Sequence, residues 1–72
     1  MDETHDQKIA AEVRAELGRK ELSCAALARM TGMPEPTLRR RLKGSAPFRV
    51  HELETVAEVL HVPVAQFLSG AA

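Results

Sequence analysis

Basic side chains are concentrated in the middle of the 72-residue chain and are its most evident ligand-binding groups. Residues 29–49 contain six Lys and Arg and one acid, whereas residues 1–21 contain four bases and six acids. Residues 50–72 contain three acids and no Lys or Arg. The formal net charge of zero argues at first against a nucleic-acid partner. Because a local field of one sign steers a polyanion to a surface, the central segment still predicts such a partner.

Cysteine and histidine side chains form no recognisable reactive or metal site. Cys24 is the sole cysteine, which excludes an internal disulfide and a multi-cysteine zinc site and favours a reducing cytoplasm. At a helix N-terminus its thiol could act as a redox switch, but we favour the interpretation of a small filler residue. His5, His51 and His61 lack metal-ligand spacing, so we expect them at the surface and predict no metal.

The sequence does not predict an enzyme. Glu52 and Glu54 would lie on different faces of a helix and suggest no acid–base pair. The chain has no glycine-rich phosphate loop and little room for a substrate cavity, so neither a cofactor nor a small-molecule ligand is expected. The acidic N-terminus lacks the features of a signal peptide, and no apolar run approaches the roughly 20 residues of a membrane span. We expect a cytoplasmic protein with no membrane partner.

The elements that position the basic segment are all predicted to be helices. Phe48 and Phe67 are the only aromatic residues, so aliphatic side chains must supply most of the core. No segment alternates with the period of a strand. We expect an all-α, compact five-helix bundle with a flexible arm at residues 1–6, one domain at residues 7–69 and a tail at residues 70–72.

Apolar periodicity and capping residues locate the first two helices. A first helix has Ile9, Val13 and Leu17 on its apolar stripe, and Gly18 near its C-terminal end suits a left-handed cap. Its outward face is expected to carry Lys8, Glu12, Arg14 and Glu16. Ser23 is the expected N-cap of a second helix, which ends where Gly32 can take a positive φ.

Prolines and glycines delimit the remaining helices. The third helix should begin at Pro34 or Glu35 and end near Lys43, before Gly44, because proline is tolerated only in a first turn. Phe48 is expected to turn inward from the loop that follows. A fourth helix is marked by apolar residues at Val50, Leu53, Val56, Ala57 and Leu60, and a fifth covers residues 63–68.

Residues 23–33, together with Thr37, Leu38 and the Lys43-Gly44 pair, resemble the helix-turn-helix of the Cro/CI repressor family, also called XRE-like. The resemblance extends over residues 7–69, and residues 38–44 look especially similar to small phage and actinobacterial regulators. It implies a lambda-repressor-like DNA-binding domain whose second and third helices form the helix-turn-helix. The shared positions have physical roles, since Ala28 lets two helices cross closely and Gly32 makes the turn.

The chain departs from the family pattern at several positions. Cys24 stands where the family commonly has a glutamine that touches DNA, which puts that contact in doubt. N-cap positions that are often Ser or Thr are occupied by Pro34, Arg49 and Pro63, so these helices are expected to lack side-chain caps. Arg41 replaces a usually apolar residue, and we expect its stem to cover the core while its guanidinium reaches solvent.

The resemblance places the N-terminal half of the third helix in the major groove. It assigns base contacts to Glu35, Pro36, Thr37, Arg39 and Arg40. Arginine reads guanine well because its fork bonds O6 and N7 together. Phosphate contacts are assigned to Ser23, Cys24, Lys43, Ser45 and Arg49. The alternative is that the arginines form an ordinary solvated face.

The favoured function is a sequence-specific transcriptional regulator, such as a phage or prophage repressor or Cro-like protein, bound to a double-stranded DNA operator. Two copies on a palindrome would give useful specificity, with the homodimer formed beforehand or only on DNA. Its patch would be Val64, Phe67 and Leu68, which could equally close a monomer's core. The alternatives are a protein-interaction module, such as an antitoxin or anti-repressor, and an excisionase-like recombination factor that bends DNA.

Overall fold

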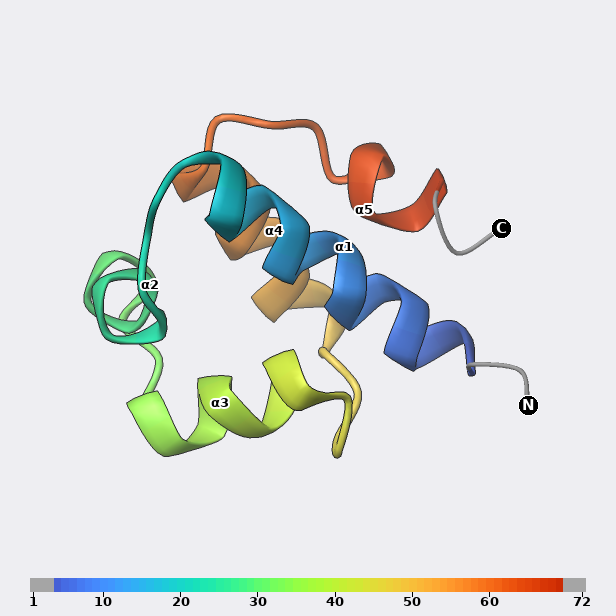
Figure 1. Ribbon diagram of the computed structural model, residues 1–72, viewed down its shortest axis with the longest axis horizontal. Coiled ribbons are helices and arrows are strands. Elements are labelled where there is room, and N and C mark those ends of the chain that lie inside the picture. Colours follow the sequence, from blue (N-terminus) through green and yellow to red (C-terminus); the bar gives the residue numbers. More distant parts are fainter. Residues whose placement is uncertain (1–3, 70–72) are drawn as a thin grey trace.

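Five helices account for most of residues 4–69, the part of the chain that the computed structural model describes (Figure 1). They are α1 (His5–Arg19), α2 (Cys24–Thr31), α3 (Glu35–Lys43), α4 (Val50–Val59) and α5 (Ala65–Ser69). No strand occurs among these described residues. The all-α class and the order of five helices are therefore confirmed, although the fifth helix begins two residues later than predicted.

The first helix begins at His5 because residues on either side of its start cap each other. The Gln7 backbone N–H donates to Thr4 Oγ1 at 3.1 Å, and the Thr4 backbone N–H donates to Gln7 Oε1 at 3.0 Å. This reciprocal capping box satisfies two backbone donors. His5 and Asp6 are thus helical, although the sequence predicted a flexible arm over residues 1–6. Residues 1–3 of that arm and the predicted tail at residues 70–72 lie outside the described residues.

The end of α1 differs from the prediction that Gly18 forms a left-handed cap. Gly18 lies within the helix, and the left-handed residue is Glu21, with φ 55°. The Leu22 backbone N–H donates to the Leu17 carbonyl at 2.9 Å, and the Glu21 backbone N–H donates to the Gly18 carbonyl at 3.2 Å. This Schellman pattern fixes the left-handed position three residues beyond the glycine. The prediction for Gly18 was wrong because it relied on residue type alone.

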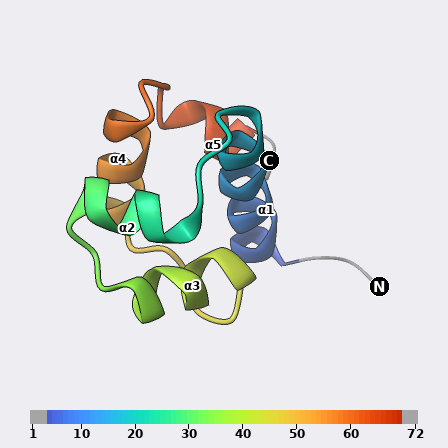
Figure 2. The ribbon, with the colours of Figure 1, turned by 60° about the vertical axis from the view of Figure 1, so that its left-hand side comes forward.

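The core is formed mostly by aliphatic side chains, as the composition required, and α5 contributes the aromatic ring of Phe67. Val13, Leu27, Leu38 and Val56 are fully buried, and Phe67 closes the core from α5 with no exposed surface. Helix α1 packs against α3 and α5, and α2 packs against α3 and α4 (Figure 2). Of the two roles expected for Phe67, a dimer patch or closure of a monomer's core, its complete burial favours closure of the core.

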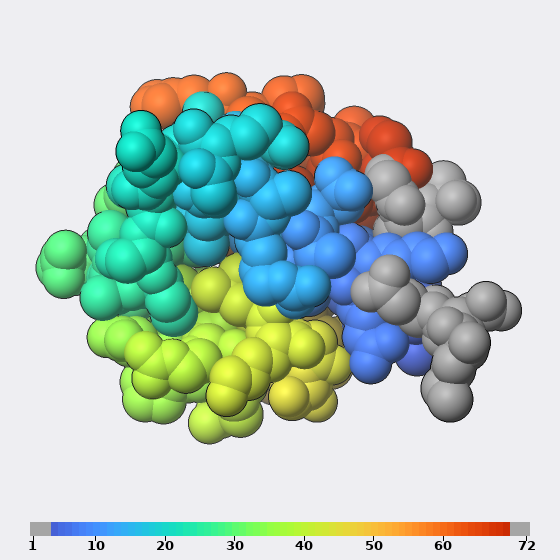
Figure 3. Space-filling view, viewed as in Figure 1, coloured from blue at the N-terminus to red at the C-terminus, as the bar shows by residue number. Residues whose placement is uncertain are grey.

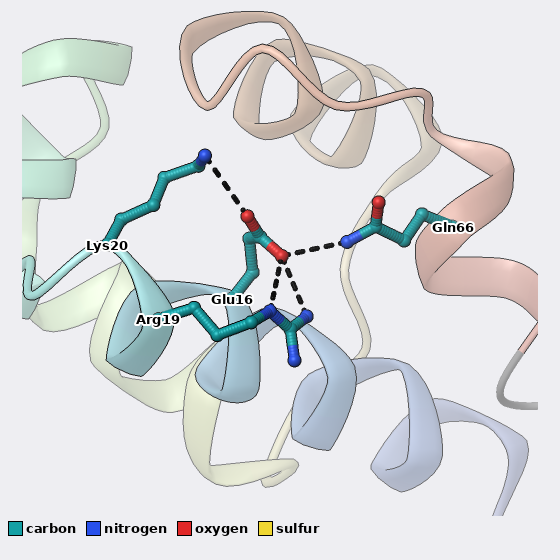
Figure 4. Close-up of polar contacts among 4 residues, drawn as sticks. All are labelled: Glu16, Arg19, Lys20 and Gln66. Carbon is teal, nitrogen blue, oxygen red and sulfur yellow. Dashed lines mark hydrogen bonds and ion pairs between the residues drawn. The ribbon is translucent and has the colours of Figure 1, made fainter.

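A carboxylate that was predicted to face solvent is buried between α1 and α5. Glu16 is 5% exposed, and its Oε1 accepts from Arg19 Nη2 at 2.7 Å and from Gln66 Nε2 at 2.8 Å (Figure 4). Lys20 Nζ lies 3.2 Å from Oε2. Hydrogen bonding by Arg19, aided by Lys20 and Gln66, holds the pKa of Glu16 below its usual value despite burial. Because α5 covers this side of α1, the outward prediction for Glu16 was wrong.

Candidate nucleic-acid interface

Helix α3 lies along one edge of the molecule, with only its inner face covered. In Figures 1 and 2 it forms the lower edge of the fold, and the space-filling view in Figure 3 shows its atoms at the lower rim of the same face. Leu38 and Leu42 are its buried residues. The predicted start and end are confirmed, since Pro34 is the N-cap and Gly44 is the left-handed C-cap at φ 80°. As predicted, Pro34 makes no side-chain cap.

Two contacts fix the C-terminal end of α3 against α1. Arg14 Nη1 donates to the carbonyl oxygen of Leu42, which places a cation at the negative end of the helix. A Cβ on Gly44 would lie 3.0 Å from Gln7 Cγ, so a side chain there would have to displace the Gln7 side chain slightly, and the φ of 80° itself favours glycine. Sequence reasoning missed Arg14, which it treated only as a residue of the outward face.

The three consecutive arginines of α3 have three different environments. Arg39 is exposed and its Nη2 forms an ion pair with Glu35 Oε2 one turn earlier. Arg40 is exposed, and its Nη2 lies 3.5 Å from Thr37 Oγ1, a long hydrogen bond. The side chain of Arg41 is only 12% exposed and points toward α4. Two of the three guanidinium groups are therefore available on the surface of α3.

Arg41 does not reach solvent as predicted, because a buried carboxylate neutralises it. Its Nε donates to Glu52 Oε1 at 2.9 Å and its Nη2 donates to Glu52 Oε2 at 3.3 Å. The Arg41 hydrogen bond is the main reason why the pKa of Glu52 is lowered, and the same bond raises the pKa of Arg41. The pair fixes α3 to α4 without placing an unpaired charge in the core.

Glu52 also organises the start of α4. The Arg49 backbone N–H donates to Glu52 Oε1 at 2.9 Å. The third residue of α4 thus satisfies the backbone donor of Arg49, the residue that precedes the helix. The arginine side chain makes no cap of its own, as the sequence predicted. In a capping box, a glutamate at the third helical position accepts from the backbone N–H of the N-cap residue, which is usually Ser or Thr. That signal in the sequence could have identified Glu52 as a positioning residue.

The predicted phosphate-contacting residues lie at the start of α2, at the end of α3 and in the loop between α3 and α4. Ser23 is exposed and caps α2 by accepting from the Ala26 backbone N–H at 3.0 Å, whereas Cys24 is half-buried against the core. Lys43, Ser45 and Arg49 are exposed at the end of α3 and in the loop that leads to α4. Their side chains are thus open to a ligand, and α2 lies beside α3 in Figures 1 and 2.

The remaining residues predicted to contact bases lie at the start of α3 and are at least partly exposed. Pro36 is exposed, whereas Glu35 and Thr37 are partly exposed, and all three lie in the first turn of α3.

Within the described part of the chain there is no pocket, and no group of three or more His, Cys, Asp or Glu could hold a metal. No helix in residues 4–69 is long and apolar enough to cross a membrane. The exposed face of α3 is therefore the most distinctive candidate surface.

The geometry defines an all-helical domain in which α2, the Gly32 turn and α3 form a helix-turn-helix. The chain belongs to the BetR domain family, whose model matches residues 5–72. Its fold is similar to that of the clp gene regulator ClgR from C. glutamicum, with a TM-score of 0.89 at 20% sequence identity, covering 97% of this chain and 91% of that one. The search of curated proteins found no match.

Proposed function

We propose that this protein is a sequence-specific regulator that binds double-stranded DNA with α3 in the major groove. The observation that carries the proposal is the division of the arginines, because Arg39 and Arg40 are exposed while the side chain of Arg41 is largely covered by its pairing with Glu52. An α-helix fits the major groove, and an arginine fork can bond guanine O6 and N7 with roughly 1–3 kcal/mol of discrimination. The exposed pair is the part of the basic segment suited to reading bases.

The comparisons support a regulatory role of this kind. The similar structure is described as that of a gene regulator, and its fold matches over nearly the whole chain. The helix-turn-helix resemblance to the Cro/CI family supports the finer assignment to a repressor or Cro-like protein. In this proposal the protein acts in the cytoplasm of a bacterial or phage-infected cell by occupying an operator.

The contacts in the complex would come from two groups of residues. Base contacts are proposed for Glu35, Pro36, Thr37, Arg39 and Arg40 in the first turns of α3. Phosphate contacts are proposed for Ser23, Cys24, Lys43, Ser45 and Arg49. Phosphate contacts fix the orientation of a protein on the duplex without carrying sequence information, so the two groups would differ in their effect on specificity.

Two copies of the protein would be needed for useful specificity, because one small domain reads only a few base pairs. Of the residues assigned to a dimer surface, Val64 is half-buried and Leu68 is 41% exposed. Helix α5 lies at the edge of the molecule away from α3 in Figures 1 and 2. A contact through α5 would therefore leave the reading helix uncovered.

The experiment that tests the proposal is selection of duplexes from a random DNA pool by the wild-type protein and by the Arg39→Ala/Arg40→Ala variant. We expect wild type to enrich one short motif and the variant to lose it. Affinity for the motif should fall steeply with salt, because bound phosphates release counterions. The variant should retain its helical circular dichroism, since both side chains are exposed.

The opposite outcome would favour a protein-interaction module on the same scaffold. If no motif emerges and binding stays weak even at low salt, α3 does not read DNA. The zero net charge of the chain and the cysteine at the family's glutamine position would then be understood as features of a protein-binding surface.

A further inference from the structure

The acidic residue in the basic segment lies directly on the proposed reading surface. Glu35 is the one acid within residues 29–49, and it occupies the first turn of α3. Its carboxylate is paired with Arg39, and the two side chains are 40% and 52% exposed. A negative charge at this position opposes attraction of the phosphate backbone, so its presence requires a physical explanation.

The two exposed arginines of α3 are held differently. Arg39 Nη2 donates to the carboxylate of Glu35, whereas Arg40 Nη2 has a long contact of 3.5 Å with the neutral hydroxyl of Thr37. The positive charge of Arg40 is therefore free to attract phosphate. That of Arg39 is locally neutralised, although the guanidinium still has N–H donors outside the pair.

A phosphate and a guanine place different demands on a guanidinium paired in this way. A phosphate oxygen is anionic, so at the Arg39 fork it would either displace the Glu35 carboxylate or lie close to it. Guanine O6 and N7 are neutral acceptors. They can accept from the N–H groups of Arg39 that are not bonded to Glu35, so the ion pair can remain intact. The pair therefore disfavours phosphate contacts more than contacts with a base.

From this geometry we propose that Glu35 is a specificity-determining positioning residue, which acts through Arg39 to suppress binding to non-cognate DNA. The inference rests on the proposed DNA-binding function and deepens it. When Glu35 no longer neutralises it, Arg39 can pair with a phosphate, and attraction between two unit charges a few ångströms apart near a protein surface changes an equilibrium by roughly three- to tenfold. Glu35 would thus reduce affinity for any duplex lacking a guanine at the right position, with a smaller effect on the cognate site.

The test compares wild type, Glu35→Gln, Arg39→Ala and the double variant Glu35→Gln/Arg39→Ala. Each is titrated with the selected duplex and with a scrambled duplex over a range of salt concentrations. We expect Glu35→Gln to bind the scrambled duplex about three- to tenfold more tightly. Its salt slope on that duplex should steepen by about 0.9, the value for one added phosphate contact. The ratio of cognate to scrambled affinity should fall by about threefold or more.

The matched control is Glu54→Gln, which removes the same charge from an exposed carboxylate on α4. It should leave the ratio of the two affinities unchanged. The effect of Glu35→Gln should disappear in the Arg39→Ala background. An equal effect of Glu54→Gln, or an undiminished effect of Glu35→Gln without Arg39, would overturn the proposal, because either would show a general effect of net charge.

The controls also separate this inference from the proposed function. If wild type discriminates between the two duplexes and Glu35→Gln discriminates equally well, only the role of Glu35 is wrong. If wild type itself enriches no motif and shows no salt-dependent binding, the DNA-binding proposal fails and the role of Glu35 fails with it.

Discussion

Arg41 and Glu52 form a nearly buried ion pair that joins the last turn of α3 to the first turn of α4. The Nε–Oε1 distance is 2.9 Å, and the side chains are 12% and 11% exposed. The same carboxylate oxygen accepts the Arg49 backbone N–H. One carboxylate thus fixes both the proposed reading helix and the end of the loop that carries proposed phosphate contacts. The pair holds α3 and α4 in place, whereas the exposed Arg39 and Arg40 beside it are the residues proposed to contact DNA.

We expect removal of one member of this pair to be strongly destabilising. Glu52→Gln leaves the Arg41 charge largely buried without a counterion, which should lower the free energy of unfolding by about 2–4 kcal/mol. The double variant Arg41→Leu/Glu52→Gln should be more stable than Glu52→Gln alone, because it removes the unpaired charge and keeps an acceptor for Arg49. Urea denaturation followed by circular dichroism measures each value.

The control is Glu54→Gln, whose carboxylate is exposed on the same helix. It should change stability by no more than about 0.5 kcal/mol. If Glu52→Gln were equally mild, the pair would contribute little to the position of α3, and the structural role assigned to Glu52 would be wrong.

The two buried carboxylates predict an acid limit to stability. The pKa values of Glu16 and Glu52 are lowered in the folded protein, chiefly by hydrogen bonds from Arg19 and Arg41 respectively, below their ordinary value of 4.5. Groups with a lowered folded pKa stabilise the protein above the unfolded pKa, and this contribution is lost as the pH falls through the folded pKa. The free energy of unfolding should therefore be constant near neutrality and decline below about pH 4.5.

Denaturation curves for wild type and Glu16→Gln between pH 7 and pH 3 would test this expectation. Glu16→Gln should be less stable than wild type at pH 7, and the difference should shrink as the pH falls, since both side chains then become neutral. A difference that stays constant over the whole range would show that Glu16 stabilises the protein through packing alone.

Two helices end on left-handed residues that are not glycine, which predicts stabilising substitutions. Glu21 has φ 55° after α1, and His61 has φ 58° after α4. Both side chains are exposed. Since this conformation costs an L-residue about 1 kcal/mol or more, Glu21→Gly and His61→Gly should each raise the free energy of unfolding by about 0.5–1 kcal/mol.

A matched glycine within a helix gives the opposite expectation. Glu58→Gly, at an exposed position in α4, should lower stability by about 1 kcal/mol relative to alanine at the same position. Thermal unfolding of Glu21→Gly, His61→Gly, Glu58→Gly and Glu58→Ala distinguishes the two effects. A destabilised Glu21→Gly protein would contradict the Schellman geometry at the end of α1.

The parts of the fold that local signals determine could be predicted from the sequence. Ser23 was predicted to cap α2, and its hydroxyl does accept the Ala26 backbone N–H. Gly32 and Gly44 were placed at the ends of α2 and α3, and both have positive φ. Such caps depend on a few consecutive residues, so the sequence contains the information directly.

The burial of charged residues could not be predicted in the same way. Apolar periodicity shows which face of a helix is hydrophobic, but not which neighbouring helix covers its margin. Glu16 is covered because Gln66 reaches it from α5, fifty residues later in the chain. The side chain of Arg41 is largely covered because Glu52 pairs with it from α4. The residues proposed to contact bases lie together on α3, as the helix prediction required, whereas the contacts that hold α3 in place, from Arg14 and Glu52, depend on tertiary structure.

Lys43 and Arg49 should act on affinity without altering the sequence that is read. Both are exposed at the end of α3 or in the following loop, and their proposed ligands are phosphates. Lys43→Ala and Arg49→Ala should weaken binding to the selected and scrambled duplexes by similar factors. Each should reduce the salt slope by about 0.9, because one fewer phosphate is neutralised. Lys8→Ala, which removes a cation from α1, should change neither the affinity for the two duplexes nor the salt slope. A change in the enriched motif on replacing Lys43 or Arg49 would instead indicate a base contact, and would extend the reading surface beyond the first turns of α3.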